Sequence, residues 1–449
     1  MRRPIVAGFR TVIRVYFRSI QSIGAVPAAT VGGRVFVANH HNALVDPILI
    51  LTDAPCAISP VAKSTLWKIP GLRWLLDATG AVPIVRRQDA PDKSADSNDD
   101  AFAKIAQHLA CGGNILIFPE GISHAEPSLA PLRSGAARML LAAHALAPAA
   151  ALSFQAVALE FDERDMFRSR TALLWGPPRL LADVATATVD AAIAANAADA
   201  TEDGNRDAVA TIVTAQMAHD LRGLIIESAS GEDRLLVGRV AQLVTNATLA
   251  AASATSLGDE LAVARIVATL GQQVQTSSPA HIDAVRIAVQ AYFAALGSAE
   301  LRDVDVAQPD RRRPLGELLR LGAAAPLALV GLLLYALPYP LPRLIARRAD
   351  DADMVSTLKL GVAVLMYPLY ASVLVVLALW LWPGRLAAVA ATAAVVSPFV
   401  TVWWLDRWQQ RPGRLATRSS EIRTLLVGLR ATACQEVELA HAHARLMGA

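Results

Sequence analysis

Residues 34–47 read RVFVANHHNALVDP, and this stretch decides the fold of the first third of the chain. Arg34–Ala38 is a short β-rich run, and the apolar residues of Pro47–Thr52 follow a helical pattern. Four polar side chains lie between the two: Asn39, His40, His41 and Asp46. One interpretation is a helix start, with Asp46 at the N-cap and Pro47 at the first helical position. The other is the working loop of an enzyme.

The alternation of strands and helices continues to about residue 180. Further strands are predicted at Ala57–Val61, Ala81–Val85, Asn114–Phe118, Phe154–Glu160 and Thr171–Trp175, and further helices at Leu66–Ala78, Ala101–Leu109 and Gly135–Leu146. This order predicts an α/β domain with a largely buried sheet over residues 31–180.

Composition indicates that part of the chain lies in lipid. Hydrophobic residues make up 54% of the 449 residues, charged residues only 18%, and the mean hydropathy is +0.38. A net charge of +3, without alternating aromatic and basic residues, argues against a nucleic-acid partner. Cys56, Cys111 and Cys434 form no CxxC pair, so we expect reduced thiols and neither a disulfide framework nor a zinc site.

The first 30 residues are basic and apolar in a helical pattern. Arg10, Arg14 and Arg18 interrupt the unbroken apolar core that a secretory signal needs, and their spacing of four gathers them on one helical face. We expect an amphipathic helix on an anionic membrane surface over residues 1–30. The alternative is a helix that packs on the soluble domain with a solvated basic edge.

Three uncharged segments are each long enough to cross a hydrocarbon core of about 30 Å. They are residues 321–342, 360–384 and 386–405. The last two predict a transmembrane hairpin over 360–405. Basic residues flank its two outer ends, which predicts a multi-pass protein of the cell membrane with its catalytic domain on the cytoplasmic face.

Residues 311–343 carry arginines at both ends and prolines at 326, 338, 340 and 342. We therefore expect an interfacial or re-entrant segment there. The alternative has three full spans and places the C-terminal tail opposite the catalytic domain. Residues 181–310 predict a helical insert to which the sequence assigns no role, and residues 406–449 a cytoplasmic helical tail.

Other chemistry-bearing residues also follow predicted strands. GAVPIVRR ends in Arg86 and Arg87, ILIFPEGISH contains Glu120 and Gly121, and PLRSGAARMLL contains Arg133. A histidine with a carboxylate, cations and a glycine turn at strand ends are the layout of a ligand crevice in an α/β fold.

In this order the segments resemble the glycerolipid acyltransferase family, whose members acylate glycerol 3-phosphate or its monoacyl product. The resemblance covers residues 34–178 and implies a mixed sheet flanked by helices. The family motif is Asn-His followed by Asp after four or five residues, and NHHNALVDP meets it in two registers, through His41 or through His40. The family's base directly follows Asn, which favours His40, with His41 kept as the second candidate.

The sequence also departs from the family. Ile122-Ser123-His124 follows PEG where most members have Thr-Arg, so the usual phosphate-binding arginine is missing and Arg133 is expected to replace it. In the fourth block, Ala156 and Ala158 stand at the sites of Pro and Gly.

The resemblance implies acyl transfer from a thioester to an alcohol. His40 or His41 would take the hydroxyl proton, and Asp46 would hold the ring tautomer. The expected substrate-binding residues are Asn39, Arg86, Arg87, Glu120, Gly121 and Arg133. No metal or cofactor is expected. Acyl-CoA or acyl-carrier protein would be the co-substrate, with membrane lipid and a phosphorylated glycerol acceptor as partners.

Two other functions stay open at this point. One is a non-catalytic lipid-binding scaffold on the same fold, which the altered fourth block suggests. The other is a metal-dependent hydrolase that uses His40, His41 and Asp46 as ligands.

Overall fold

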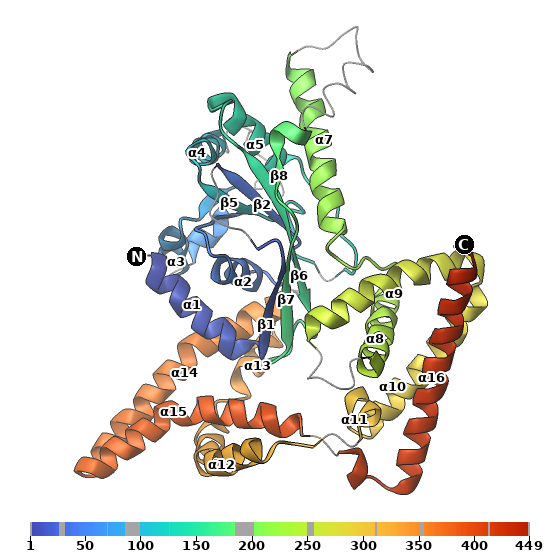
Figure 1. The fold of residues 1–449 in the computed structure, drawn as a ribbon. Helices are drawn as coiled ribbons and strands as arrows, with labels where there is room; N and C mark the ends of the chain where they lie inside the picture. The colour runs from blue at the N-terminus through green and yellow to red at the C-terminus, as the bar shows by residue number, and fades with distance from the viewer. Residues whose placement is uncertain are drawn as a thin grey trace. The chain divides into compact units, whose positions relative to one another are not determined.

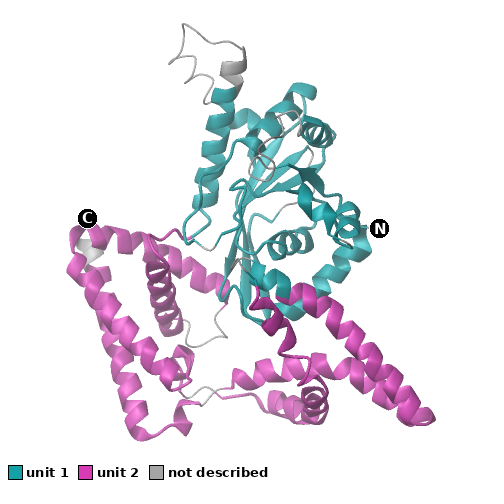
Figure 2. Ribbon diagram, turned by 180° about the vertical axis from the view of Figure 1, so that it is seen from behind, with its two compact units in different colours: residues 1–225, 349–358 teal, residues 226–348, 359–449 magenta. Residues whose placement is uncertain are grey.

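The computed structural model describes residues 2–26, 32–69, 71–85, 99–124, 126–184, 202–248, 256–309, 312–349, 354–411 and 414–447. Contacts divide the chain into two compact units, Met1–Ile225 with Ala349–Leu358, and Ile226–Arg348 with Lys359–Ala449 (Figure 2). The first boundary thus follows Ile225, well beyond the expected residue 180.

The first unit is built on one mixed sheet (Figure 1). Its strands are β1 (Ser19–Gly24), β2 (Arg34–Ala38), β3 (Ser59–Lys63), β4 (Val82–Ile84), β5 (Asn114–Ile117), β6 (Ser153–Phe161), β7 (Arg170–Trp175) and β8 (Arg179–Leu180). The order is β1-β7-β6-β2-β5-β3-β4, with β8 on β6. Pairings with β6 are antiparallel for β7 and β8, and the other pairings are parallel. The predicted fold class is confirmed.

Helices bury the sheet. They are α1 (Arg2–Tyr16), α2 (Val45–Asp53), the 3-10 helix η1 (Ser64–Lys68), α3 (Leu72–Thr79), α4 (Asp99–Ala110), α5 (Gly135–Leu146) and α7 (Glu202–Arg222). In Figure 1, α2 and α7 lie on opposite sides of the sheet. The aromatic side chains of Phe36, Phe154 and Trp175 are buried in its core. Although α7 was expected in the insert, it packs on β6 and α5 and belongs to this unit.

The N-terminal segment differs from the expected helix over 1–30. Helix α1 ends at Tyr16, and Ser19–Gly24 forms edge strand β1, which pairs in parallel with β7. Helix α1 packs against α2 and α3, with Ile13 and Tyr16 buried, and Arg10 donates to the carbonyl of Thr52. These contacts agree with the alternative of packing on the soluble domain. Membrane contact by the exposed basic face stays a prediction.

The second unit contains a helical bundle. It consists of α8 (Gly231–Thr248), α9 (Leu257–Ser277), α10 (Pro279–Ser298), α11 (Asp303–Ala307) and α16 (Ser420–Met447). Residues of α8, α10 and α16 share one core, in which Val289, Tyr292 and Leu426 are buried. Leu426, Ala433 and Ala440 recur every seven residues along α16, a spacing that puts them on one helical face. Most of the expected tail is therefore part of the bundle.

A buried polar network ties the bundle together. The Asp303 carboxylate accepts hydrogen bonds from Tyr292 Oη at 2.6 Å, Asn246 Nδ2 at 2.8 Å and Arg430 Nε at 2.8 Å. Burial, followed by the Asp303 charge, raises the pKa of Tyr292. Four helices thus meet at one charged pair, which is costly to break because either partner alone would be a buried unpaired charge.

Three helices of the second unit are long and apolar enough to cross a membrane: α12 (Leu315–Tyr335), α14 (Met354–Leu381) and α15 (Gly384–Gln409). The short helix α13 (Leu341–Ala346) follows α12, and the 3-10 helix η4 (Leu415–Thr417) follows α15. Pro326 lies inside α12 without ending it, contrary to the expectation that it breaks the helix. The break comes after Tyr335, where Pro338, Pro340 and Pro342 follow.

Helix α12 runs antiparallel to α15. Trp404 Nε1 donates to the Leu321 carbonyl, and Tyr335 Oη donates to the Ala394 carbonyl. Tyr370 of α14 donates to the carbonyl of Leu334. At about 1.5 Å per residue, α12 therefore ends about 15–17 Å short of the turn between α14 and α15.

From that level the chain returns to Met354, where α14 begins, about 24 Å back along α14 at the same rise per residue. A full crossing by α12 would end near the turn of the hairpin instead. The geometry therefore agrees with a re-entrant segment over 311–343. Its placement in a membrane stays a prediction.

Candidate active site

The site lies at the edge of the sheet where β2 and β5 end. The two strands are parallel neighbours, so their carboxyl ends, Ala38 and Ile117, open at the same edge. The chain leaves β2 directly into Asn39 and His40, and leaves β5 into Phe118, Pro119 and Glu120. Sheet topology thus brings together two motifs that lie 80 residues apart in sequence.

His40 and Asp46 form a buried pair. His40 Nδ1 lies 3.0 Å from Asp46 Oδ2, and their side chains are 11% and 0% exposed. A carboxylate only accepts hydrogen bonds, so when Asp46 is ionised Nδ1 carries the proton and Nε2 keeps its lone pair. The His40 ring stacks on Phe118, with centroids 4.0 Å apart. The imidazole is held on one face by an aromatic ring and at one nitrogen by an anion.

Asp46 does not cap helix α2, as local sequence signals suggested. The N-cap residue is Leu44, and Asp46 lies in the first turn. Its Oδ2 accepts the backbone N–H groups of His41 and Asn42, both at 2.7 Å, in addition to the His40 ring. The carboxylate thus closes the loop that precedes the helix, because that loop turns back over it. Its other oxygen, Oδ1, is buried without a protein partner.

The two registers of the motif place the two histidines differently. The His41 ring turns away from Asp46, and its Nδ1 lies 3.0 Å from the carbonyl oxygen of His124. Only its backbone N–H reaches Asp46. The longer register, from His40 to Asp46, is therefore the one that forms a histidine–carboxylate pair.

Glu120 lies behind this loop and not on its open side. Its side chain is 0% exposed. Oε1 accepts the backbone N–H of His40 at 2.9 Å, while Oε2 accepts that of Ala130 at 2.9 Å and the ring Nε2 of His124. Protein donors occupy both oxygens, so this geometry favours a positioning role over the expected contact with substrate.

Asn39 is also occupied by the protein. Its Nδ2 donates to the Leu159 carbonyl at 3.1 Å, and its Oδ1 accepts the Leu159 N–H at 2.8 Å. This side-chain bridge to β6 continues the pairing of β2 and β6 beyond its last residue pair, Ala38 with Val157. Asn39 therefore fixes the strand end from which His40 leaves, instead of facing a substrate.

Gly121 and Arg133 are adjacent. Gly121 has a φ of +76°, and a Cβ there would lie 2.8 Å from Arg133 Nε, so only glycine fits the turn without displacing the arginine. The backbone N–H of Arg133 donates to the Pro119 carbonyl at 2.8 Å, and its side chain is exposed. Arg133 is thus the predicted cation that the structure brings to the site. Arg86 and Arg87 lie outside the described residues.

His124 completes the cluster, although sequence analysis gave it no role. Its backbone N–H donates to the His40 carbonyl at 3.1 Å, its carbonyl contacts the His41 ring, and its own ring donates to Glu120. The available signal was its position four residues after Glu120 in PEGISH. No three His, Cys, Asp or Glu side chains among the described residues converge as metal ligands.

Helix α14 begins at the active-site loop. Thr357 Oγ1 accepts the backbone N–H of Leu44 at 3.1 Å, and Ser356 Oγ donates to the Arg164 carbonyl at 2.9 Å. Both contacts lie within the first unit, to which residues Ala349–Leu358 belong. The first turn of an apolar 28-residue helix is therefore bonded two residues from Asp46.

Fold and site together define an α/β domain with a histidine–carboxylate pair at the carboxyl edge of its sheet. Comparison with known proteins gives this class a family: residues 19–155 match the family model described as Acyltransferase. These residues form an acyltransferase-family domain, which confirms the predicted resemblance.

Two similar proteins were found. Glycerol-3-phosphate O-acyltransferase 2 of Saccharomyces cerevisiae (strain ATCC 204508 / S288c) is 40% identical over 81 residues, which are 18% of this chain and 11% of that protein. The chain therefore matches only a small part of the yeast relative's length. The crystal structure of the 1-acyl-sn-glycerophosphate acyltransferase from Thermotoga maritima aligns with 15% identity and a TM-score of 0.31, over 49% of this chain and 82% of that one.

Proposed function

We propose that this protein is a membrane-bound O-acyltransferase that moves a fatty acyl group from a thioester to a hydroxyl of glycerol 3-phosphate or 1-acylglycerol 3-phosphate. The observation that carries the proposal is the buried His40–Asp46 pair within a domain of the acyltransferase family. The acceptor class is taken from the names of the two similar proteins.

His40 is the base in this mechanism. The acceptor hydroxyl binds at His40 Nε2, which takes its proton as the alkoxide oxygen attacks the thioester carbonyl. The tetrahedral intermediate then collapses, the new ester forms, and the proton passes from His40 to the leaving thiolate. Asp46, on Nδ1, stabilises the imidazolium between these two proton transfers. Such general-base catalysis contributes about 10²–10⁴ in rate.

The other residues act by position and charge. Arg133 binds the acceptor phosphate by charge-assisted hydrogen bonds, and Arg86 and Arg87 are further candidates for this contact. Glu120, His124 and Asn39 hold the loop that carries His40. His41 lies beside the site with its ring bonded to His124, which gives it a neighbouring position and not that of the base.

A metal-dependent hydrolase needs His40, His41 and Asp46 to converge on one ion. The His41 ring is instead turned toward the carbonyl of His124, so this alternative has no ligand set. Direct acyl transfer, with acyl-CoA or acyl-carrier protein as donor and no metal or cofactor, is therefore the mechanism that we propose.

The membrane is the source of one substrate and the destination of the product. We propose that α14 and α15 span the cell membrane as a hairpin, that α12 enters and returns, and that the catalytic domain faces the cytoplasm. The bond from Leu44 to Thr357 supports this arrangement, because it begins the hairpin at the active-site loop.

The test is a panel of acceptors with labelled acyl-CoA and acyl-carrier protein, using the full chain in lipid nanodiscs. We expect transfer to a phosphorylated glycerol, its loss in His40→Ala, and its retention in His41→Ala. Lipid binding without transfer to any acceptor would instead support a non-catalytic scaffold.

A further inference from the structure

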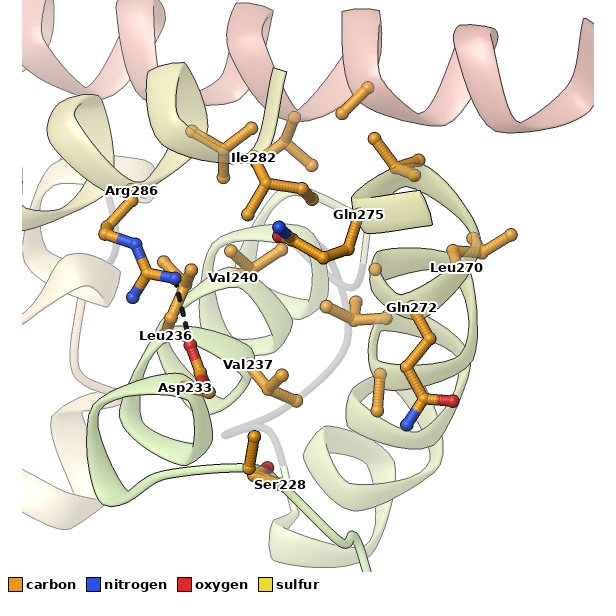
Figure 3. Close-up of a pocket in the computed structure, with 18 of the residues that line it drawn as sticks. Ser228, Asp233, Leu236, Val237, Val240, Leu270, Gln272, Gln275, Ile282 and Arg286 are labelled. Atoms are coloured by element: carbon orange, nitrogen blue, oxygen red, sulfur yellow. Dashed lines mark hydrogen bonds and ion pairs between the residues drawn. The ribbon is translucent and has the colours of Figure 1, made fainter. Parts of the chain in front are cut away.

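The helical bundle contains a hollow that the acyl-transfer site does not use. It has a volume of about 550 Å³ and lies between α8, α9, α10 and α16 (Figure 3). Ligand pockets in proteins measure about 300–1,000 Å³, so the hollow is large enough for one small molecule. All residues that line it belong to the second unit.

The walls of the hollow are aliphatic. Its lining includes Leu236 and Val240 of α8, Val267 and Leu270 of α9, Ile282 of α10 and Val437 of α16. Small residues, among them Ala268 and Gly271, line it as well and leave the space between the helices unfilled. No Phe, Tyr or Trp lines it. Protein-binding surfaces are rich in aromatic anchors, so this lining suits a hydrocarbon chain better than a protein partner.

One corner of the hollow is polar. Arg286 Nη2 donates to Asp233 Oδ1 at 2.9 Å, and this bond, together with Ser230, lowers the pKa of the Asp233 carboxyl. A guanidinium has five N–H donors, so the pair with Asp233 leaves Arg286 able to bind a second anion. In Figure 3 the Gln275 amide points into the hollow, and Arg286 lies at its edge. Apolar walls with one cationic corner are complementary to a single-chain anionic amphiphile.

We propose that this hollow binds a single-chain anionic lipid, with the hydrocarbon chain among the side chains of α8, α9 and α10 and the head group beside Arg286 and Gln275. Two sources share this chemistry, a free fatty acid and a lysophosphatidate. The site is separate from His40, so the inference does not depend on the proposed acyl transfer.

The test uses a long-chain fatty acid with a diazirine in mid-chain, photolysed with the full chain in lipid nanodiscs, and maps adducts by mass spectrometry. We expect adducts on peptides of α8, α9 and α10. Val267→Trp should fill the hollow and lower this labelling more than about tenfold, the loss expected when about two chain methylenes are displaced. Ile266→Trp is the matched control, because Ile266 is 60% exposed and does not line the hollow.

Leu236→Trp fills the hollow from α8 and repeats the test if Val267→Trp fails to fold by circular dichroism. Competition by unlabelled palmitate or by lysophosphatidate identifies the head group, and either supports the site. His40→Ala should lose turnover but keep the labelling, which separates this inference from the proposed function. Adducts confined to α12, α14 and α15, or equal labelling of the Val267→Trp and Ile266→Trp variants, would overturn it.

Discussion

Replacing Asp46 by Asn tests the central pair of the site. Asp46 Oδ2 accepts all three donors, the His40 ring and two backbone N–H groups. The oxygen of an Asn at this position can keep these three bonds, so the His40 tautomer is retained. What the variant loses is the negative charge that faces the imidazolium.

The size of this loss follows from the distance. Nδ1 and Oδ2 are 3.0 Å apart. With charge centres about 4 Å apart and an effective dielectric constant of about 20, the attraction is about 4 kcal/mol. If this energy acts on the transition state, kcat falls about 10³-fold. The new NH₂ would occupy the place of Oδ1, which has no protein partner, so we also expect a loss of about 1–3 kcal/mol in unfolding free energy.

The assay is steady-state acyl transfer with the full chain in nanodiscs, alongside thermal unfolding to show that the variant is folded. His41→Ala is the matched control, since its ring does not contact Asp46, and it should keep kcat within about tenfold of the parent chain. A folded Asp46→Asn variant with nearly unchanged kcat would refute the role of the carboxylate. Loss of turnover in His41→Ala but not in His40→Ala would refute the register.

Three further substitutions test contacts around and beyond the site. His124→Ala removes a buried donor to Glu120 and should lower the unfolding free energy by about 1–3 kcal/mol, whereas His124→Gln keeps a donor and should recover part of it in thermal melts. Thr357→Val removes the acceptor of the Leu44 N–H and should lower turnover a few fold, whereas Thr357→Ser should not. Asp303→Ala leaves Arg430 buried without its partner and should cost about 3–5 kcal/mol in denaturant unfolding, against about 0–1 for Asp233→Ala at the more exposed pair with Arg286.

Local patterns predicted most of the sheet. The β-rich run at Arg34–Ala38 is β2, and the helical pattern at Gly135–Leu146 is α5, because both segments bury the residues that create their periodicity. Strand β1 was missed because SIQSIG carries little apolar pattern and pairs with β7, about 150 residues later. A strand specified by a distant partner leaves no local signal.

The site was predicted in its residues but not in their geometry. Asp46–Pro47 has the sequence of a helix cap, yet the carboxylate accepts N–H groups of the loop before the helix. Whether His40 or His41 faces that carboxylate depends on the path of the loop, in which Ala43 has a φ of +28°. Asn39 and Glu120 were expected to contact substrate because the pattern shows where polar groups lie, but not which of them the protein already occupies.

The direction of the membrane hairpin can be decided by labelling. In the re-entrant arrangement, Arg385 at the turn between α14 and α15 lies outside the cell and Arg348 lies inside. Three full spans would exchange the two, because α12 would then carry Arg348 across. Single-cysteine variants Arg385→Cys and Arg348→Cys, made after replacing the native cysteines, can be treated with a membrane-impermeant maleimide on intact cells.

We expect labelling of Arg385→Cys alone, and of both variants after the cells are permeabilised. The reason is the depth of α12: its last turn lies level with Ala394 and Tyr370, near the middle of the hairpin, so the chain has to turn back before it reaches the far surface. Labelling of Arg348→Cys alone on intact cells would show three spans, and would mean that α12 passes the level at which Tyr335 contacts α15. That result would also place the C-terminal end of α15 outside the cell, away from the Thr357 end of α14 that is bonded to the active-site loop.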